Sequence, residues 1–211
     1  ALERHFSCIL IMLALGAVMM FLGGVHLRWF ALGGGVVAVF AIIYLTRMGY
    51  AGDRVTAWRD PASDPTDTGY QILQSLYAIG SGGLMGLGLG KGRQKYLYLP
   101  EEHNDYIFPI VCEELGFVGA VVVILLFVLL ILRGYWIAMH ARDRFGALMA
   151  AGLTTHLALQ VFLNIGVVTN FLPATGISLP FFSYGGTALL IQLFEMGLIL
   201  AISRQNDNKL L

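Results

Sequence analysis

The residues best suited to chemistry gather between residues 91 and 116. Lys91, Arg93 and Lys95 are followed by the run YLPEEHNDYIFPIVCEELG, which carries five acidic side chains and one histidine. Asp105 directly precedes an apolar run, where a carboxylate at a water–membrane boundary can accept a proton from an attacking hydroxyl. The three cations could meet phosphate. The pattern predicts a site of mixed charge at the start of an apolar helix.

The other ionisable residues have less specific interpretations. Acidic residues at membrane depth usually mark a cavity, a relay or a partner, but Glu113 and Glu114 could equally cap a helix start or lie at headgroup level. His103 and Asp105 are too few to define a metal site. Glu195 could pair with another helix or face a partner, and His156 is more typical of a satisfied helix-packing group than of a catalyst.

The glycine-rich run GLGLGKG, residues 86–92, is not a nucleotide-binding loop. A Walker A motif requires G-x-x-x-x-G-K-[ST], but Met85 stands at the first glycine position and Gly92 follows Lys91. A dinucleotide fingerprint needs a preceding strand, which the sequence does not predict. The run therefore indicates a backbone that closely approaches a ligand or another helix.

Composition places these residues in a membrane protein. Of the 211 residues, 57% are hydrophobic and 12% are charged, about half the charged fraction of a soluble domain. The net charge of zero removes the electrostatic argument for binding nucleic acid. Cys8 and Cys112 lie in apolar runs and indicate neither a disulfide framework nor a zinc site. The chain starts at Ala1 without a signal peptide, so we expect a fragment of a longer protein.

The predicted fold is an all-α integral membrane protein with about five transmembrane helices and one large extracellular loop. About 20 apolar residues are needed to cross the hydrocarbon core. Segments that meet this requirement lie at about 6–25, 29–46, 106–132, 145–168 and 184–203. Within the loop, at about 47–105, apolar residues at helical spacing after Gly69 predict an amphipathic helix, followed by an interfacial or re-entrant glycine-rich element that rests on protein.

The charge distribution predicts the orientation. Short loops with excess Arg and Lys face the cytoplasm, which places the hairpin with Arg28, the segment 133–144 and the C-terminus inside. The connector 169–183 has no basic residue and faces outside, with the 47–105 loop. Residues 47–114 hold 15 of the 26 charges. Function is therefore expected at the outer surface.

Two long motifs resemble the SEDS family of FtsW, RodA and SpoVE proteins. The run from Asp67 to Gly116 is similar to the family's large extracellular loop, and NIGVVTNFLPATGISLPFFSYGG, residues 164–186, is similar to its last outer loop. The RQK-x-x-YLPE form, residues 93–101, is closer to the division and sporulation branch than to the RodA branch. The resemblance covers nearly the whole chain and implies the C-terminal half of a ten-helix bundle.

The resemblance implies a peptidoglycan glycosyltransferase that polymerises lipid II at the outer face of the bacterial cytoplasmic membrane, in division or sporulation. Asp105 falls on the catalytic Asp of the H-[TN]-D-[FY]-I-F motif. The other predicted site residues are expected to bind the lipid-linked substrate; they are Arg54, Lys91, Arg93, Lys95, His103, Glu113, Glu114, Ser183, Gly185 and Gly186. No nucleotide is required because the donor already carries a pyrophosphate leaving group, and a divalent metal, Mg²⁺ or Mn²⁺, could assist it.

The implied partners are a class B penicillin-binding protein, which supplies the transpeptidase, and divisome-type membrane proteins. Two rival functions remain open from the sequence. A lipid II flippase would use Glu113, Glu114 and Glu195 along a transport pathway. A scaffold that only recruits a transpeptidase would tolerate substitution of Asp105.

Overall fold

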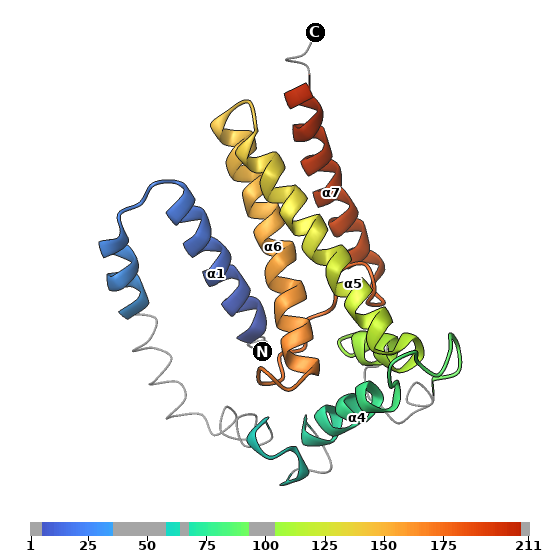
Figure 1. Cartoon of the computed structure of the whole chain (residues 1–211). Coiled ribbons are helices and arrows are strands. Elements are labelled where there is room, and N and C mark those ends of the chain that lie inside the picture. Colours follow the sequence, from blue (N-terminus) through green and yellow to red (C-terminus); the bar gives the residue numbers. More distant parts are fainter. Residues whose placement is uncertain (1–5, 36–57, 64–67, 93–103, 208–211) are drawn as a thin grey trace.

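The structure is a bundle of helices, as the sequence predicts. Among residues 6–35, 58–63, 68–92 and 104–207, which this computed structural model describes, every regular element is helical. The long helices α5 (Ile107–Met139), α6 (Arg144–Val168) and α7 (Gly186–Asp207) stand side by side, and α4 (Thr68–Ser81) lies across the end at which α5 begins (Figure 1). The helix α1 (Phe6–Leu22) packs on α6, and the short 3₁₀ helix η1 (Pro61–Ser63) packs on α4.

Three of these helices, α5, α6 and α7, are long and apolar enough to cross a membrane. They coincide with the third, fourth and fifth predicted spans. In the first predicted span, α1 has 17 residues, which at 1.5 Å per residue is about 25 Å, short of the roughly 30 Å hydrocarbon core. In the second predicted span, the chain is helical over residues 27–35, and the remainder lies outside the described residues.

The end of α5 differs from the sequence prediction. We expected the third span to finish near residue 132 and Arg133 to lie in a loop, but the helix continues to Met139. The Arg133 guanidinium stacks over the Trp136 ring at 4.2 Å. A long cationic side chain can thus stay on a helix at the membrane boundary by extending its charged end over an interfacial aromatic ring.

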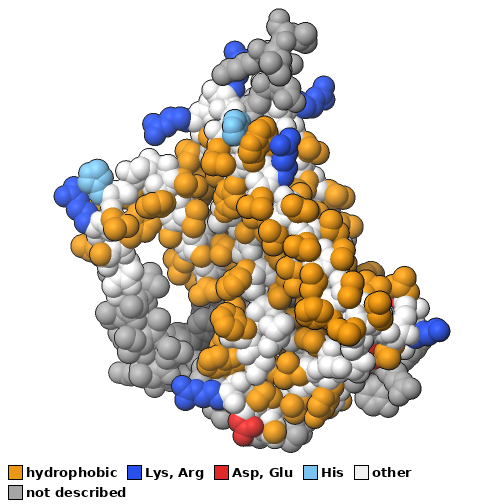
Figure 2. All heavy atoms as spheres, in the orientation of Figure 1, with side chains coloured by type: hydrophobic (Ala, Val, Ile, Leu, Met, Phe, Trp, Pro, Cys, Tyr) orange, Lys and Arg blue, Asp and Glu red, His pale blue; other side chains and the backbone are white. Residues whose placement is uncertain are grey.

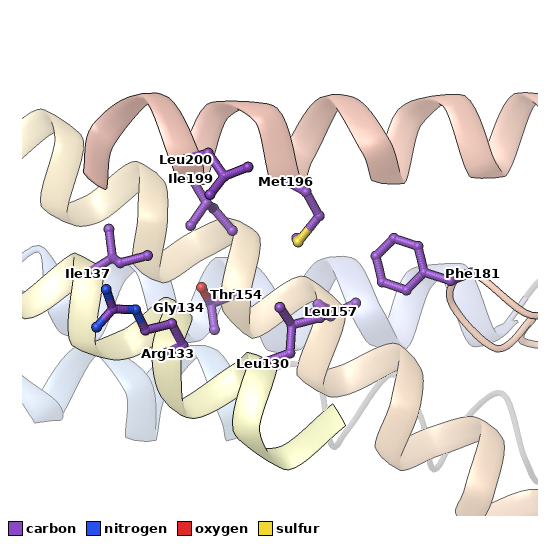
Figure 3. A pocket seen from close by; sticks show the side chains of 10 residues that line it. All are labelled: Leu130, Arg133, Gly134, Ile137, Thr154, Leu157, Phe181, Met196, Ile199 and Leu200. Atoms are coloured by element: carbon purple, nitrogen blue, oxygen red, sulfur yellow. The ribbon is translucent and has the colours of Figure 1, made fainter. Parts of the chain in front are cut away.

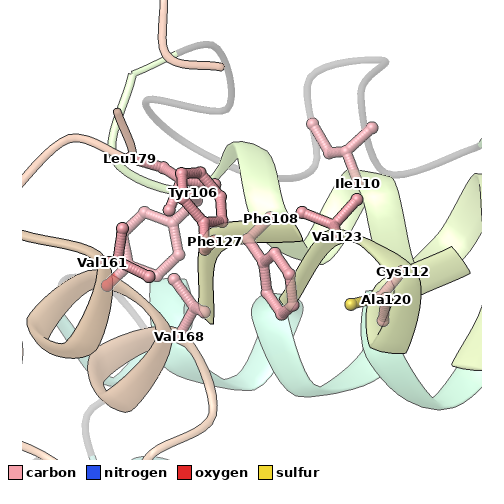
Figure 4. Packing of buried hydrophobic residues seen from close by; sticks show 10 residues of the cluster. All are labelled: Tyr106, Phe108, Ile110, Cys112, Ala120, Val123, Phe127, Val161, Val168 and Leu179. Atoms are coloured by element: carbon pink, nitrogen blue, oxygen red, sulfur yellow. The ribbon is translucent and has the colours of Figure 1, made fainter. Parts of the chain in front are cut away.

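Buried apolar side chains join the three long helices. One cluster connects the first two thirds of α5 with α6 and the connector between α6 and α7, and it includes Tyr106, Phe127, Val161 and Leu179 (Figure 4). A second cluster joins the opposite ends of the same helices and includes Ile137, Ala150 and Ile199. Much of the outward surface is also apolar (Figure 2), as expected where lipid or further helices surround the chain.

The described basic residues are unevenly distributed. Arg28 precedes the second predicted span, Arg142 lies between α5 and α6, Arg144 is the first residue of α6, and Arg204 lies in the last turn of α7. These positions fall at the end of the bundle opposite to α4 (Figures 1 and 2). The chain is thus a membrane protein with a basic end, and the assignment of that end to the cytoplasm stays a prediction.

Candidate active site

Asp105 lies in a turn that directly precedes α5. Residues 104–106 form this turn, and Tyr106 is the residue before the first helical position. The Asp105 side chain is half-buried. The carboxylate therefore occupies the predicted position at the mouth of an apolar helix.

The connector between α6 and α7 supplies the other wall of this site. The helix α6 stops because Asn170 adopts a left-handed conformation (φ 58°), and the amides of Phe171 and Leu172 donate to the Gly166 carbonyl at 2.8 and 2.9 Å. Asn is one of the few residues that readily adopts this conformation after a helix. The chain thereby turns back toward the start of α5.

Two side chains hold the Asp105 turn against the connector. Ser183 donates from Oγ to the Asn104 carbonyl at 2.6 Å and accepts from the Leu179 amide at 2.7 Å. Asn164 on α6 donates from Nδ2 to the carbonyls of Asp105 and Ile177, both at 2.7 Å. The two motifs that the sequence predicts on one face of the membrane therefore lie in direct contact.

Gly176 provides space for the carboxylate. It has a φ of 64°, and a Cβ at this position would lie 3.2 Å from Asp105 Oδ2. A side chain would be strained by the backbone conformation and would press on the carboxylate oxygen. Gly176 thus allows the connector to approach Asp105 closely.

A cavity of about 540 Å³ opens beside this turn. Its lining includes Ile107 at the start of α5, Ser183, and the glycines Gly185 and Gly186 at the start of α7. Three predicted substrate-binding residues thus share one cavity next to the Asp105 turn. Its size is in the range of small-molecule binding sites.

The predicted glycine-rich element forms a loop against a break in α5. Gly116 interrupts that helix with φ 71° and ψ −171°. The amides of Phe117 and Val118 donate to the carbonyls of Gly83 and Leu84, at 2.9 and 3.2 Å. In return, the amides of Leu87 and Gly88 donate to the carbonyls of Glu113 and Glu114, at 2.9 and 3.0 Å. The loop thus satisfies backbone groups that the helix break exposes, as a membrane setting requires.

Glu113 and Glu114 hold the glycine-rich loop against the break in α5 at Gly116, a contact called the joint below. Glu114 accepts from the Gly90 amide at 2.9 Å, and Glu113, whose exposed fraction is 1%, has its carboxylate beside Gly92. Lys91, between these glycines, is exposed, and its amide donates to Gly88 at 3.0 Å. Their contacts give both carboxylates a structural role in holding the loop, and their contact with substrate stays a prediction.

Four predicted site residues lie outside the described part of the chain: Arg54, Arg93, Lys95 and His103. In the part that is described, no group of three or more His, Cys, Asp or Glu side chains gathers as a metal would require. Mg²⁺, however, is commonly held by one or two carboxylates together with substrate phosphates and water. Asp105 fits that role as a single ligand.

The two intramembrane groups on α6 and α7 pair with each other. His156 Nδ1 and Glu195 Oε1 lie 3.1 Å apart, with both side chains largely buried. This agrees with the expectation that His156 is a satisfied packing group and that Glu195 can pair with another helix. The pair joins α6 to α7 at a depth where an unpaired charge is costly.

A second cavity, of about 320 Å³, lies between α5, α6 and α7 (Figure 3). Leu130, Leu157 and Ile199 are typical of its lining, with Phe181 at the end nearer the connector. Arg133 is the one charged residue among the residues that line it. Without a carboxylate or a histidine, this cavity offers no acid–base chemistry.

Asn164 and Gly176 are not among the site residues that the sequence predicts. Both lie in the second motif, but neither is an acid, a base or a cation. The available signal was a polar residue at position 164 within a segment of 50 residues, 145–194, that has no charge. Its significance depends on a contact with Asp105, 59 residues earlier in the chain.

Comparison with known proteins identifies the family. Residues 1–208 match the family described as "Cell cycle protein", that of FtsW, RodA and SpoVE. The chain belongs to this family. It is 47% identical to a probable peptidoglycan glycosyltransferase FtsW of Geobacter sp. (strain M18), over 95% of the chain and 55% of that protein. It is 45% identical to Stage V sporulation protein E of Bacillus subtilis and to the peptidoglycan glycosyltransferase MrdB of Escherichia coli, over 89% of the chain and 51% of each.

The chain spans about half the length of the curated relatives it matches. These FtsW, sporulation and MrdB relatives differ little in identity, so a division, sporulation or elongation role stays a prediction. The fold also matches a solved structure titled "Structural coordination of polymerization and crosslinking by a peptidoglycan synthase complex". The TM-score is 0.75 at 28% identity, over 97% of this chain and 57% of that one. RodA of Thermus thermophilus, solved as an Asp-to-Ala variant, matches with a TM-score of 0.51 at 27% identity, over 91% and 63% of the two chains.

Proposed function

We propose that the protein containing this chain is a glycosyltransferase that polymerises lipid II into glycan strands. The observation that carries the proposal is Asp105, a half-buried carboxylate at the start of a membrane helix, held against a glycine-containing connector beside a cavity of about 540 Å³. The relatives named peptidoglycan glycosyltransferase support it.

In the proposed reaction, Asp105 acts as the general base. A hydroxyl of the acceptor sugar loses its proton to the Asp105 carboxylate. At the same time, the hydroxyl oxygen attacks the anomeric carbon of the donor sugar. The new carbon–oxygen bond forms as the bond from that carbon to the pyrophosphate oxygen breaks. Polyprenyl pyrophosphate leaves with the electron pair. A well-placed general base contributes roughly 10²- to 10⁴-fold in rate.

The leaving group acquires negative charge, which nearby cations would stabilise. Lys91 is exposed on the glycine loop, and Arg54, Arg93 and Lys95 are the further candidates. We also propose that a divalent metal, Mg²⁺ or Mn²⁺, would supply further positive charge near the pyrophosphate, and Asp105 is the described carboxylate that would hold it. No nucleotide takes part because the donor is already activated.

The site would face the outer side of the bacterial cytoplasmic membrane, in a multi-pass protein whose C-terminus is cytoplasmic. The basic end of the described bundle, opposite to Asp105, supports this orientation through the positive-inside rule. A class B penicillin-binding protein is the proposed partner, supported by the match to a synthase complex that couples polymerisation with crosslinking. Divisome-type membrane proteins would recruit the pair, and nucleic acid has no role.

The contacts of the acidic residues favour an enzyme over a flippase. A transport pathway would use Glu113, Glu114 and Glu195. Glu114 instead accepts from the glycine loop, Glu113 is buried beside that loop, and Glu195 pairs with His156. Carboxylates engaged in this way are poorly placed to line a pathway through the bilayer.

Reconstitution separates the two functions. The full-length protein, with its transpeptidase partner, is incorporated into vesicles that contain fluorescent lipid II. We expect glycan polymers, resolved by gel electrophoresis, and release of polyprenyl pyrophosphate in proportion. Movement of lipid II between leaflets without any polymer would contradict the proposal and favour the flippase.

A further inference from the structure

We infer that Asn164 is a positioning residue for Asp105, acting through the backbone of the carboxylate-bearing turn. The inference rests on the proposed function and deepens it, because it assigns a part in the reaction to a side chain that cannot itself accept or release a proton. The observation is the juxtaposition of one buried amide with two carbonyls from different segments.

The chemistry of the contact fixes the orientation of the amide. Asn164 has an exposed fraction of 1%, and its two partners are the carbonyl oxygens of Asp105 and Ile177, both at 2.7 Å. Carbonyls only accept hydrogen bonds, so the NH₂ group must face them. Its two hydrogens are matched by two acceptors. A carboxylate or a methyl group in the same place would leave both carbonyls without a donor.

The two hydrogen bonds of Asn164 restrain the backbone on both sides of the Asp105 carboxylate. On one side, the bond to the Asp105 carbonyl restrains the peptide of the turn before α5. On the other, Ile177 follows Gly176, whose missing side chain makes room for Asp105 Oδ2. Asn164 therefore sets the distance between the carboxylate and the connector. A shift of about 1 Å in a catalytic group is enough to cost roughly 100-fold in rate.

Substitution of Asn164 should affect kcat more than substrate binding. Asn164 does not belong to the lining of the cavity beside Ser183, so substrate affinity should depend on it weakly. The inference predicts a lower kcat with a nearly constant KM. An Asp at position 164 would also become able to donate when protonated, which restores one of the two hydrogen bonds.

The test uses the full-length protein with its transpeptidase partner in vesicles of anionic phospholipid and fluorescent lipid II. The variants are Asn164→Asp and Asn164→Leu, with Gln160→Leu, one turn earlier on the same helix, as the matched control. Asn164→Asp should lower kcat roughly 10- to 100-fold, leave KM within about twofold, and regain activity relative to Asn164→Leu as pH falls. Gln160→Leu should retain wild-type kcat.

Separate outcomes decide the inference and the function on which it rests. Wild-type kcat in both Asn164 variants, or a raised KM with unchanged kcat, would overturn the positioning role. Loss of both variants from the membrane would overturn it too, since it would assign Asn164 to folding alone. A wild-type protein that forms no polymer, or an Asp105→Asn variant as active as the wild type, would instead refute the proposed function.

Discussion

At the residue scale, the proposed chemistry depends on one carboxylate, that of Asp105, and on the neutral side chains that would orient it. The position of Asp105 at the start of an apolar helix could be predicted from the sequence because it directly precedes a long apolar run. Its contacts could not, since Asn164 and Ser183 are 59 and 78 residues away along the chain. Hydrogen bonds between distant segments follow from tertiary packing, which no local pattern specifies.

Ser183→Ala tests whether the Ser183 hydroxyl fixes the turn that carries Asp105. It removes the donor to the Asn104 carbonyl and the acceptor for the Leu179 amide, and the unmet backbone groups cost about 1–3 kcal/mol. We expect a lower thermal unfolding midpoint in detergent and slower polymerisation. Ser178→Ala, five residues earlier on the same connector, is the control and should match the wild type. Equal midpoints for both variants would contradict the role assigned to Ser183.

At the element scale, the sequence predicted an amphipathic helix followed by a glycine-rich segment, and the structure confirms both. Helical spacing of apolar residues predicted α4, and the glycine content predicted close backbone contact. The break in α5 at Gly116 was not predicted, because a glycine that is followed by an apolar run is compatible with a continuous membrane helix. The break depends on the loop that satisfies its exposed amides and carbonyls.

Gly86→Ala should disrupt this joint. Gly86 has a φ of 77°, and a Cβ there would overlap the backbone of Glu114. We expect a loss of at least about 1–3 kcal/mol in unfolding free energy, from strain and lost packing, seen as a lower unfolding midpoint. Gly80→Ala is the matched control on α4, where a Cβ meets no atom within 4 Å, and it should be neutral or stabilising. A Gly86→Ala variant with the wild-type unfolding midpoint would contradict the stabilising role assigned to this contact between the glycine-rich loop and α5.

The contact between α6 and α7 gives a second prediction at this scale. Glu195→Ala leaves His156 Nδ1 without its hydrogen-bond partner, and loss of this contact between largely buried side chains costs about 1–3 kcal/mol. Glu195→Gln keeps a hydrogen-bonding side chain and should lose much less. The unfolding midpoints of the two variants, measured side by side, check this. If Ala and Gln have the same effect, the pair does not stabilise the bundle.

At the scale of the whole molecule, composition and hydropathy predicted a helical membrane protein, and α5, α6 and α7 confirmed three of the spans. The predicted end of the third span was wrong, because α5 continues past Arg133 to Met139. A charge on a membrane helix can be tolerated when it reaches the interface, and hydropathy does not encode that.

Orientation can be tested by cysteine labelling in a Cys8→Ser background, which removes the exposed native thiol. A membrane-impermeant maleimide added to intact cells should label Thr169→Cys in the connector. Gln205→Cys, near the end of α7, should be labelled only after the membrane is permeabilised. The reverse pattern would place Asp105 on the cytoplasmic side and contradict a polymerase that acts at the outer face.

The central claim is that Asp105 is the general base of lipid II polymerisation. The most direct measurement is kcat of the full-length protein with its partner on fluorescent lipid II, for the wild type and for Asp105→Asn, with lipid II binding measured in parallel. We expect Asp105→Asn to lose roughly 10²- to 10⁴-fold in kcat while it still binds lipid II. Wild-type polymerisation by Asp105→Asn would contradict it.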